Sequence, residues 1–280
     1  MRTPTRPMRL NYANPLTENL VAFIPLTIPG YFVNLVSGDK ATGVYPTLLR
    51  TVRGGTLLGS TSETRTGVVF GSTYLKFPIP FGISQLYNWS IAAGVLPSGD
   101  TMGIANTSLA IAALQLASGT DESGLALMHA GNGSVTAFRA TTVNSSGSQV
   151  SASTANIASG RYTPRLVAVF RAAADRGLFS NRNAEVTNSG SFGTATPTTL
   201  RIGAWLVGGG GESGFYNEAL EYVAVWNVAQ TTTRVLEFNE NPWQILLRNS
   251  FRTYSIPYSA PVIPEQPVGG SKHRFLSFMR

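Results

Sequence analysis

The sequence contains no cysteine and few charged residues. Its 280 residues include 21 Lys and Arg against 14 Asp and Glu, so 12% of the chain is charged, where an average soluble domain has roughly 25%. The absence of cysteine excludes disulfide frameworks, zinc–thiolate clusters and thiol nucleophiles. Long apolar runs are also missing, because the longest such segment, residues 20–36, is interrupted by two prolines and a glycine. It is shorter than the ~20 continuous residues of a spanning helix, so we expect no membrane span.

The positive charge lies at the two ends of the chain. Residues 1–53 carry six basic and two acidic groups, residues 54–247 carry ten and eleven, and residues 248–280 carry five and one. Proteins that bind single-stranded nucleic acid interleave basic and aromatic residues along a groove, whereas these basic residues lie in proline-rich ends. We therefore do not expect nucleic acid as a partner, and docking on an acidic protein surface explains the same charges.

Composition divides the chain into three predicted regions. These are a basic N-terminal arm at residues 1–13, a folded domain at residues 14–247, and a Pro- and Gly-rich extended tail at residues 248–280. The arm lacks the apolar stretch of a signal peptide, so we expect no export by that route.

The tail ends in a basic and apolar peptide, for which two interpretations stay open. It is either a disordered basic tail or a docking peptide that orders on a partner. The candidate docking residues are Lys272, Arg274, Phe275, Phe278, Met279 and Arg280.

The pattern of the folded domain predicts an all-β protein. Short runs of β-branched and aromatic residues recur between Gly, Ser, Asn, Thr and Pro clusters, as in a chain of many short strands. In residues 89–96 large apolar residues alternate with small ones, so one face of this strand can enter a core. Gly131-Asn132-Gly133 predicts a tight hairpin between strands at residues 125–129 and 135–140. Residues 231–240 are the best helix candidate, with threonines to cap the start and a stop before Asn-Pro.

Eight short segments follow one another in a characteristic order, from an Asn-Pro-Leu turn at the start of the domain to an Asn-Pro-Trp ending. They are residues 14–21, 67–77, 89–97, 177–181, 200–203, 215–216, 221–227 and 239–244. Together they resemble the laminin G-like branch of the concanavalin A-like lectin sandwiches, particularly the versions found in bacteriophages and prophages.

This resemblance covers residues 14–247 and implies a jelly-roll sandwich of two antiparallel sheets whose first and last strands lie close together. The strand pattern independently predicts an all-β sandwich or barrel. If the ends meet, the two basic segments form one positive pole. The sequence departs from the family pattern at residues 181–183 and in the long loop at residues 208–214, so the resemblance does not define the loop geometry there.

The sequence shows no clear catalytic pattern. Glycoside hydrolysis needs two carboxyl groups about 5–9.5 Å apart, and the Glu-x-Asp-x-Glu run of related glucanases is missing. Glu218 and Glu221 are three residues apart and would point to opposite faces of one strand. We expect a non-enzymatic protein, with glycoside hydrolase as a remote alternative. We also expect no cofactor, although calcium stays open because Asp100 and Asp121 lie in predicted loops.

Exposed aromatic rings beside amides could bind a sugar without a metal. The candidate glycan-binding residues are Trp205 and Tyr216, which flank the loop at residues 208–214, Asn217, which adjoins it, and Tyr31, which follows a Pro-Gly turn. The alternative is that Trp205 continues the alternation of the preceding strand and packs in the core.

We predict a structural protein of a phage virion, either associated with the tail or fibre or decorating the capsid. A neutral sandwich with few charges suits dense packing in a symmetric or homo-oligomeric assembly, and the basic ends would hold it to other virion proteins. The alternative is a carbohydrate-binding module for adhesion to glycans of the host surface.

Overall fold

A computed structural model describes most of the chain up to Leu247. The described ranges are residues 8–53, 64–96, 108–115, 122–129, 136–143, 149–153, 164–190, 196–206, 212–213, 215–216 and 218–247. The chain divides into two units, Met1–Arg248 and Asn249–Arg280, and every described residue belongs to the first. The candidate docking residues of the tail therefore lie outside the described part. No helix within the ranges above is long and apolar enough to cross a membrane.

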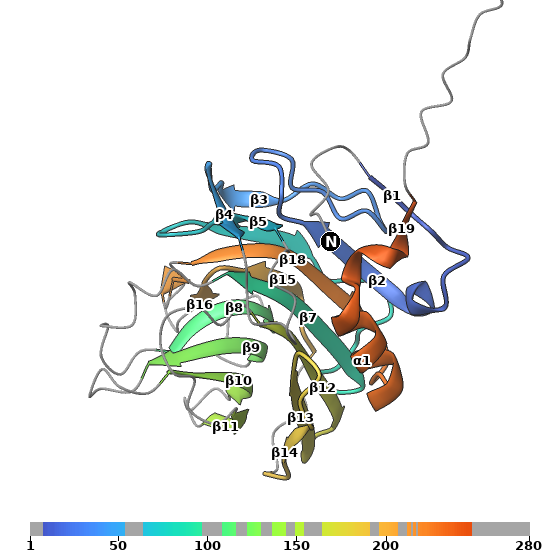
Figure 1. Cartoon of the computed structure of the whole chain (residues 1–280). Helices are drawn as coiled ribbons and strands as arrows, with labels where there is room; N and C mark the ends of the chain where they lie inside the picture. Colours follow the sequence, from blue (N-terminus) through green and yellow to red (C-terminus); the bar gives the residue numbers. More distant parts are fainter. Residues whose placement is uncertain are drawn as a thin grey trace, which may run out of the picture. The chain divides into compact units, whose positions relative to one another are not determined.

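One sheet of the first unit has seven strands, all paired antiparallel (Figure 1). Their order is β11 (Gln149–Ser153), β10 (Thr136–Val143), β9 (Glu122–His129), β8 (Ser108–Gln115), β15 (Thr199–Ile202), β6 (Tyr74–Pro78) and β3 (Thr42–Val44). The predicted hairpin is confirmed in its strands, since His129 pairs with Thr136. Its Asn-Gly turn lies outside the described residues.

The second sheet has eight strands, again antiparallel. Its order is β14 (Val186–Asn188), β13 (Asp175–Ser180), β12 (Arg165–Ala172), β7 (Trp89–Leu96), β18 (Ala219–Trp226), β5 (Thr64–Val69) and β4 (Leu48–Arg53), with β2 (Leu20–Pro25) also paired to β18. Two short ribbons complete the strands, β1 (Arg9–Leu10) with β19 (Leu246–Leu247) and β16 (Trp205–Leu206) with β17 (Glu212–Ser213). These pairings confirm the predicted all-β, two-sheet antiparallel architecture.

The first and last strands of the unit lie side by side, as the family resemblance implies. Strand β2 pairs with β18 along five positions, and Arg9 of β1 pairs with Leu247 of β19. Leu10 is 5% exposed and packs with the residues of the last turns. From Met8 onward the predicted N-terminal arm is thus part of the folded unit, because its apolar residues find a buried partner surface.

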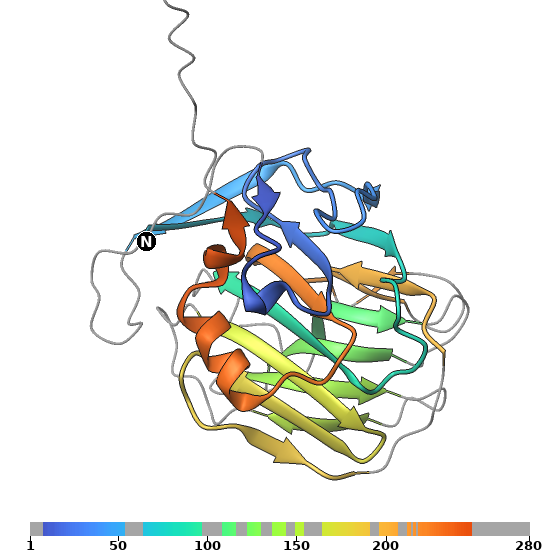
Figure 2. The same cartoon turned by 90° about the vertical axis from the view of Figure 1, so that its right-hand side faces the viewer.

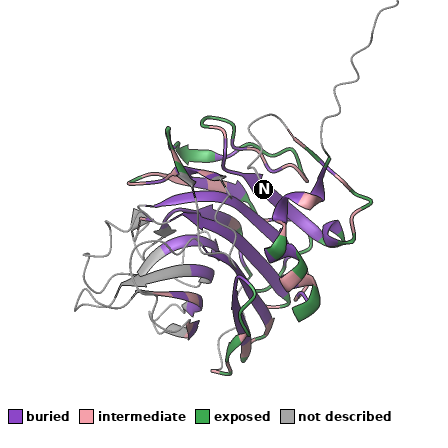
Figure 3. Ribbon diagram, viewed as in Figure 1, coloured by how far each residue is buried: buried purple, intermediate pink, exposed green. Residues whose placement is uncertain are grey.

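The main core lies between the two sheets. Trp89 and the alternate apolar residues that follow it in β7 point into this core, and the indole of Trp89 stacks on Phe170 of β12 with ring centroids 4.7 Å apart. Ala92, on the opposite face of β7, belongs to a second apolar cluster. The alternation in residues 89–96 therefore reflects a strand buried on both faces, and Figure 3 shows β7 and the neighbouring β18 buried along their length.

The second cluster covers the outer face of the eight-stranded sheet. Helix α1 (Thr232–Glu240) lies across this face (Figure 2), with the 3-10 turns η1 (Pro15–Thr17) and η2 (Pro242–Ile245) beside it. The indole Nε1 of Trp226 donates a hydrogen bond to the carbonyl of Leu16 at 3.0 Å. Aromatic rings within 6.0 Å of one another fill the layer, namely Phe23, Tyr222, Trp226, Phe238 and Trp243.

Helix α1 confirms the helix predicted at residues 231–240, and both of its ends have a physical cause. Thr231 caps the start, where its hydroxyl accepts a hydrogen bond from the backbone N–H of Arg234. At the other end, Nη1 of the buried Arg165 donates to the carbonyls of Asn239 and Glu240 at 2.9 and 2.8 Å. The last carbonyls of a helix have no partner within it, so Arg165 joins the helix layer to the sheet.

A buried ion pair lies at an irregularity of strand β18. The pairing of β18 with β7 shifts between Leu220 and Tyr222, and the carboxylate of Glu221 accepts from Nε and Nη2 of Arg65 at 2.9 and 2.6 Å. The side chains are 0% and 4% exposed. Gly94 makes room for the pair, because a Cβ there would lie 2.7 Å from Oε2 of Glu221.

Replacement of Glu221 by Gln should destabilise the protein by about 3–5 kcal/mol, because it leaves the guanidinium of Arg65 buried without its counter-charge. The matched control is Glu18→Gln, which breaks the exposed pair with Arg234 and should cost less than about 1 kcal/mol. Urea unfolding at neutral pH measures both changes, and equal losses for the two variants would contradict this account of the pair.

Candidate functional site

The structure does not bring the four predicted glycan-binding residues together on a surface. Tyr216 is fully buried in the core between the sheets, and Tyr31 is 36% exposed. Trp205 lies in β16, where its backbone pairs with Ser213 of β17. The side chain of Trp205 and all of Asn217 lie outside the described part.

The prediction for Tyr216 needs correction, because a ring without exposed surface cannot stack on a sugar. Its backbone N–H donates to the carbonyl of Gly203 at 2.9 Å, which draws the chain into the sandwich. Burial raises the pKa of Tyr216 well above its usual value, and the charge of Glu218 adds to the rise while Arg50 opposes it. Tyr216 is therefore a neutral core residue.

The two carboxylates weighed for hydrolysis are held in structural ion pairs. Glu218 pairs with Arg50, and Glu221 pairs with Arg65. Both carboxylates are almost fully buried. The predicted calcium residues, Asp100 and Asp121, lie outside the described residues, and within the described ranges no group of three or more His, Asp or Glu side chains could hold a metal ion.

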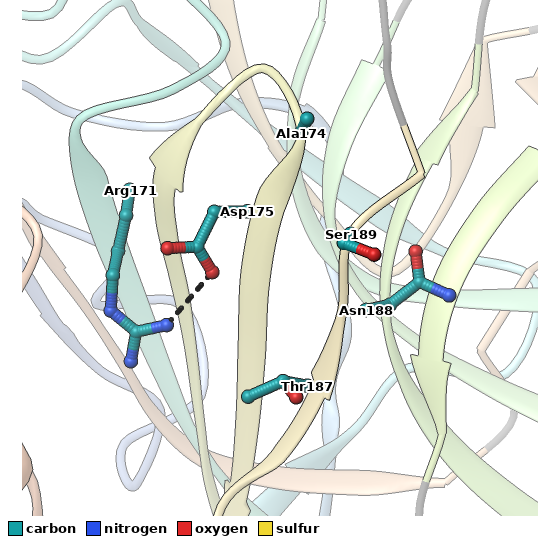
Figure 4. A pocket seen from close by; sticks show the side chains of 6 residues that line it. All are labelled: Arg171, Ala174, Asp175, Thr187, Asn188 and Ser189. Atoms are coloured by element: carbon teal, nitrogen blue, oxygen red, sulfur yellow. Dashed lines mark hydrogen bonds and ion pairs between the residues drawn. The ribbon is translucent and has the colours of Figure 1, made fainter.

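A polar pocket that sequence reasoning missed lies at the β14 edge of the eight-stranded sheet. Its volume is about 580 Å³, within the roughly 300–1,000 Å³ of typical ligand pockets. The turn between β12 and β13 forms one wall and β14 the other (Figure 4). The lining residues are Arg171, Ala174, Asp175, Thr187, Asn188 and Ser189.

The pocket begins where the apolar cover of the sheet ends. Val167 and Val169 of β12 point to the outer face and are buried in the cluster under helix α1. Arg171, two residues further on the same strand, is partly exposed, with 31% of its side chain accessible. Arg171 bonds Glu185, which lies over Gly177 on the outer face, so the face that starts as core continues as the lining of the pocket.

The central group of the pocket is the guanidinium of Arg171, which bonds two carboxylates. Nη1 donates to Oδ1 of Asp175 at 3.1 Å, and Nη2 donates to Glu185. Partial burial alone would lower the pKa of Arg171, but the hydrogen bonds and charges of Glu185 and Asp175 outweigh it, so the pKa is raised. Arg171 is a permanent cation that orients both acids.

A glycine in β13 makes this arrangement possible. Glu185 crosses strand β13 over Gly177 to reach Arg171, and a Cβ at Gly177 would overlap Oε1 of Glu185. Thr187 pairs with Gly177 in the adjacent strand, so it lies on the same outer face. In Figure 4 the side chains of Arg171, Asp175 and Thr187 lie on one side of β14, and the amide of Asn188 projects from its other side.

Hydrogen bonds of Asn188 and Arg176 fix the wall of the pocket that contains β14. Oδ1 of Asn188 accepts from the backbone N–H of Gly190 at 2.8 Å. The buried Arg176 donates through Nη2 to the carbonyls of Ala173 and Gly190 at 3.1 and 2.7 Å. These bonds join the two walls, so the positions of Asp175 and Thr187 relative to each other are fixed before any ligand binds.

Comparisons with known proteins support the fold. No family model matches the sequence, and no curated protein matches it. Among solved structures, the chain is similar to the binding domain of Paraclostridial Mosquitocidal Protein 1, with a TM-score of 0.52 and 11% identity over 81% of this chain and 53% of that one. It is also similar to the botulinum neurotoxin serotype D ligand binding domain in complex with N-acetylneuraminic acid, with a TM-score of 0.50, 10% identity and coverages of 80% and 51%.

A third similar structure is Trypanosoma rangeli sialidase, with a TM-score of 0.51, 11% identity and coverages of 82% of this chain and 34% of that one. The chain thus spans about half the length of the toxin domains and a third of the sialidase. At these identities the likeness shows the fold alone, a lectin-like β-sandwich, which agrees with the concanavalin A-like architecture predicted from the sequence.

Replacement of Gly177 by Ala should destabilise the protein by up to about 1 kcal/mol, because the methyl group displaces the end of Glu185 from its partly exposed ion pair with Arg171. In a variant that lacks the Glu185 side chain, the same methyl group should cost little. No carboxylate then lies over residue 177, and Gly in the interior of a strand is itself unfavourable. A double-mutant cycle with Glu185→Ala, read by urea unfolding, should therefore show coupling of at least ~0.5 kcal/mol. An equal cost of Gly177→Ala in both backgrounds would show that the glycine does not serve this contact.

Proposed function

We propose that the protein is a non-enzymatic carbohydrate-binding module that recognises a glycan through the pocket between the β12–β13 turn and β14. The observation that carries this proposal is an open polar pocket whose lining includes the carboxylate of Asp175, held by Arg171, and the hydroxyl-bearing residues Thr187 and Ser189. Sugars present several hydroxyl groups at fixed angles, and their recognition needs such convergent, oriented hydrogen-bonding groups.

The chemistry of each lining group fits this role. The carboxylate of Asp175 accepts hydrogen bonds from sugar hydroxyls, and hydrogen bonds to a charged group contribute more than those between neutral groups. The hydroxyls of Thr187 and Ser189 can both donate and accept. Arg171 fixes the orientation of Asp175, so little side-chain entropy is lost when a ligand binds.

The structural neighbours support the same class of function. They include toxin binding domains and a complex with N-acetylneuraminic acid, a sugar. A shared fold does not transfer a function by itself, so the proposal rests on the pocket, and the neighbours supply the precedent that such sandwiches serve as binding domains.

A role in a phage virion is the second candidate function, favoured by the charge at the ends of the folded unit. The pairing of β1 with β19 brings the N-terminal and C-terminal strands of this unit together, and the basic excess of the sequence lies in the adjoining segments. The ends would dock on acidic surfaces of other virion proteins, in a symmetric assembly, and the sandwich would present the glycan pocket to the host.

The substitution Asp175→Asn should weaken binding of the best-scoring glycan of a bacterial and mammalian array by at least about tenfold, because it removes the charged acceptor. Thr187→Val should weaken it as well, through loss of the hydroxyl. The matched control Asp39→Asn, an exposed loop acid far along the chain, should leave the dissociation constant unchanged. If both pocket variants bind the glycan as tightly as the unmodified protein and have unaltered melting temperatures, the pocket is not the glycan-binding site.

Deletion of residues 265–280 should prevent incorporation of the protein into phage particles while the sandwich still folds, as judged by circular dichroism. Particles assembled from a complementation plasmid, analysed by immunoblot, measure this directly. Incorporation at the full level would contradict anchoring through the terminal peptide and leave the glycan-binding proposal untouched.

A further inference from the structure

The charges around the pocket carry information about the class of its ligand. Three ionised side chains meet there, the carboxylates of Asp175 and Glu185 and the guanidinium of Arg171. Asp175 and Arg171 line the pocket and Glu185 bonds Arg171 beside it, so these three groups together carry one more negative than positive charge. Building on the proposed function, we infer that the glycan recognised here carries no acidic group, so that neutral saccharides are bound and carboxylated, sulfated or phosphorylated ones are rejected.

The cation of the pocket is already engaged. Arginine binds acidic ligands through its planar fork of N–H groups, usually with two parallel hydrogen bonds to one carboxylate. In this structure Nη1 of Arg171 donates a hydrogen bond to Asp175, and Nη2 donates one to Glu185. An acidic sugar that approached these two nitrogens would compete with two carboxylates that are tethered to the same sheet.

The other nearby cation does not reach the pocket. Arg176 is 1% exposed, and its Nη2 is bonded to the carbonyls of Ala173 and Gly190. It lies on the inner face of β13, in register with Asn188, whose amide projects away from Asp175. Of the residues that line the pocket, Arg171 alone is basic.

The most exposed charged side chain of the pocket is an acid. The side chain of Asp175 is 47% exposed, against 31% for Arg171 and 18% for Glu185. Asp175 is therefore the charged group that the pocket presents most openly to a ligand. A hydroxyl-rich neutral sugar can donate hydrogen bonds to this carboxylate, whereas an anionic sugar meets a like charge and loses hydration without compensation.

This selectivity differs from that of a structural neighbour. N-acetylneuraminic acid, present in the complex of the botulinum neurotoxin serotype D domain, is a sugar with a carboxylate. The present chain shares the fold of that domain at 10% identity, and fold does not determine ligand. The ion pairs of Arg171 indicate a neutral ligand for this chain.

The experiment compares matched glycans that differ in one acidic group. The full-length protein is applied to an array that holds sialylated oligosaccharides beside their desialylated counterparts, and uronic-acid polysaccharides beside neutral ones. Binding to neutral members should exceed binding to their acidic counterparts by at least about tenfold in dissociation constant. The double variant Asp175→Asn/Glu185→Gln releases Arg171 and should reverse this order, with a gain for acidic glycans.

A matched double variant controls for the change of net charge. Asp39→Asn/Glu237→Gln removes two exposed carboxylates away from the pocket and should keep the preference of the unmodified protein. Melting temperatures of all variants show that each is folded.

The possible outcomes separate this inference from the function on which it rests. Binding of acidic glycans as strongly as neutral ones, or more strongly, together with loss of that binding in Arg171→Gln, would overturn the inference and keep the pocket as a glycan site. Absence of binding to every glycan on the array would overturn the proposed function itself. An unchanged preference in the double pocket variant would show that Asp175 and Glu185 do not set the selectivity.

Discussion

The ion pair of Arg65 and Glu221 joins β5 to β18, and β18 is covered on both faces. This double cover is the constraint on which the rest of the structure depends. Strand β18 is buried along its whole length, with the seven-stranded sheet on one side and the layer of helix α1 on the other. A charged residue can enter such a strand only with a counter-charge and with room for both side chains. Arg65 provides the charge, and Gly94 provides the room.

The double cover also explains where the pocket lies. Outer-face residues are apolar where helix α1 and the first turns pack on the sheet, and they become polar where this layer ends. On β12 the change falls between Val169 and Arg171, and on the neighbouring strands Gly177 and Thr187 continue the same row. The proposed glycan pocket is thus the uncovered continuation of a buried surface, and the packed core beneath it holds the walls in place.

Much of the fold could be predicted from the sequence, because several elements carry strong local signals. The alternation of residues 89–96 marks β7, and the capping threonine with the Asn-Pro stop marks helix α1. The edge strands β11 and β14 carry no such signal, since Gln149–Ser153 and Val186–Asn188 are short and largely polar, and their state depends on pairing with a neighbour. The composition of the loop at residues 208–214 could not predict the burial of Tyr216, because Tyr216 is held by a backbone hydrogen bond to Gly203, which lies outside that loop.

The pocket was beyond sequence reasoning for a related reason. Its lining residues come from β12, from the turn that follows it, and from β14, and only the register of β12, β13 and β14 brings them together. A crystal structure of the protein soaked with its best-binding neutral glycan tests this account most directly. We expect the sugar to lie between Asp175 and Thr187, with the Arg171 ion pairs intact. A sugar bound elsewhere, such as on the seven-stranded sheet, with the pocket empty, would contradict it.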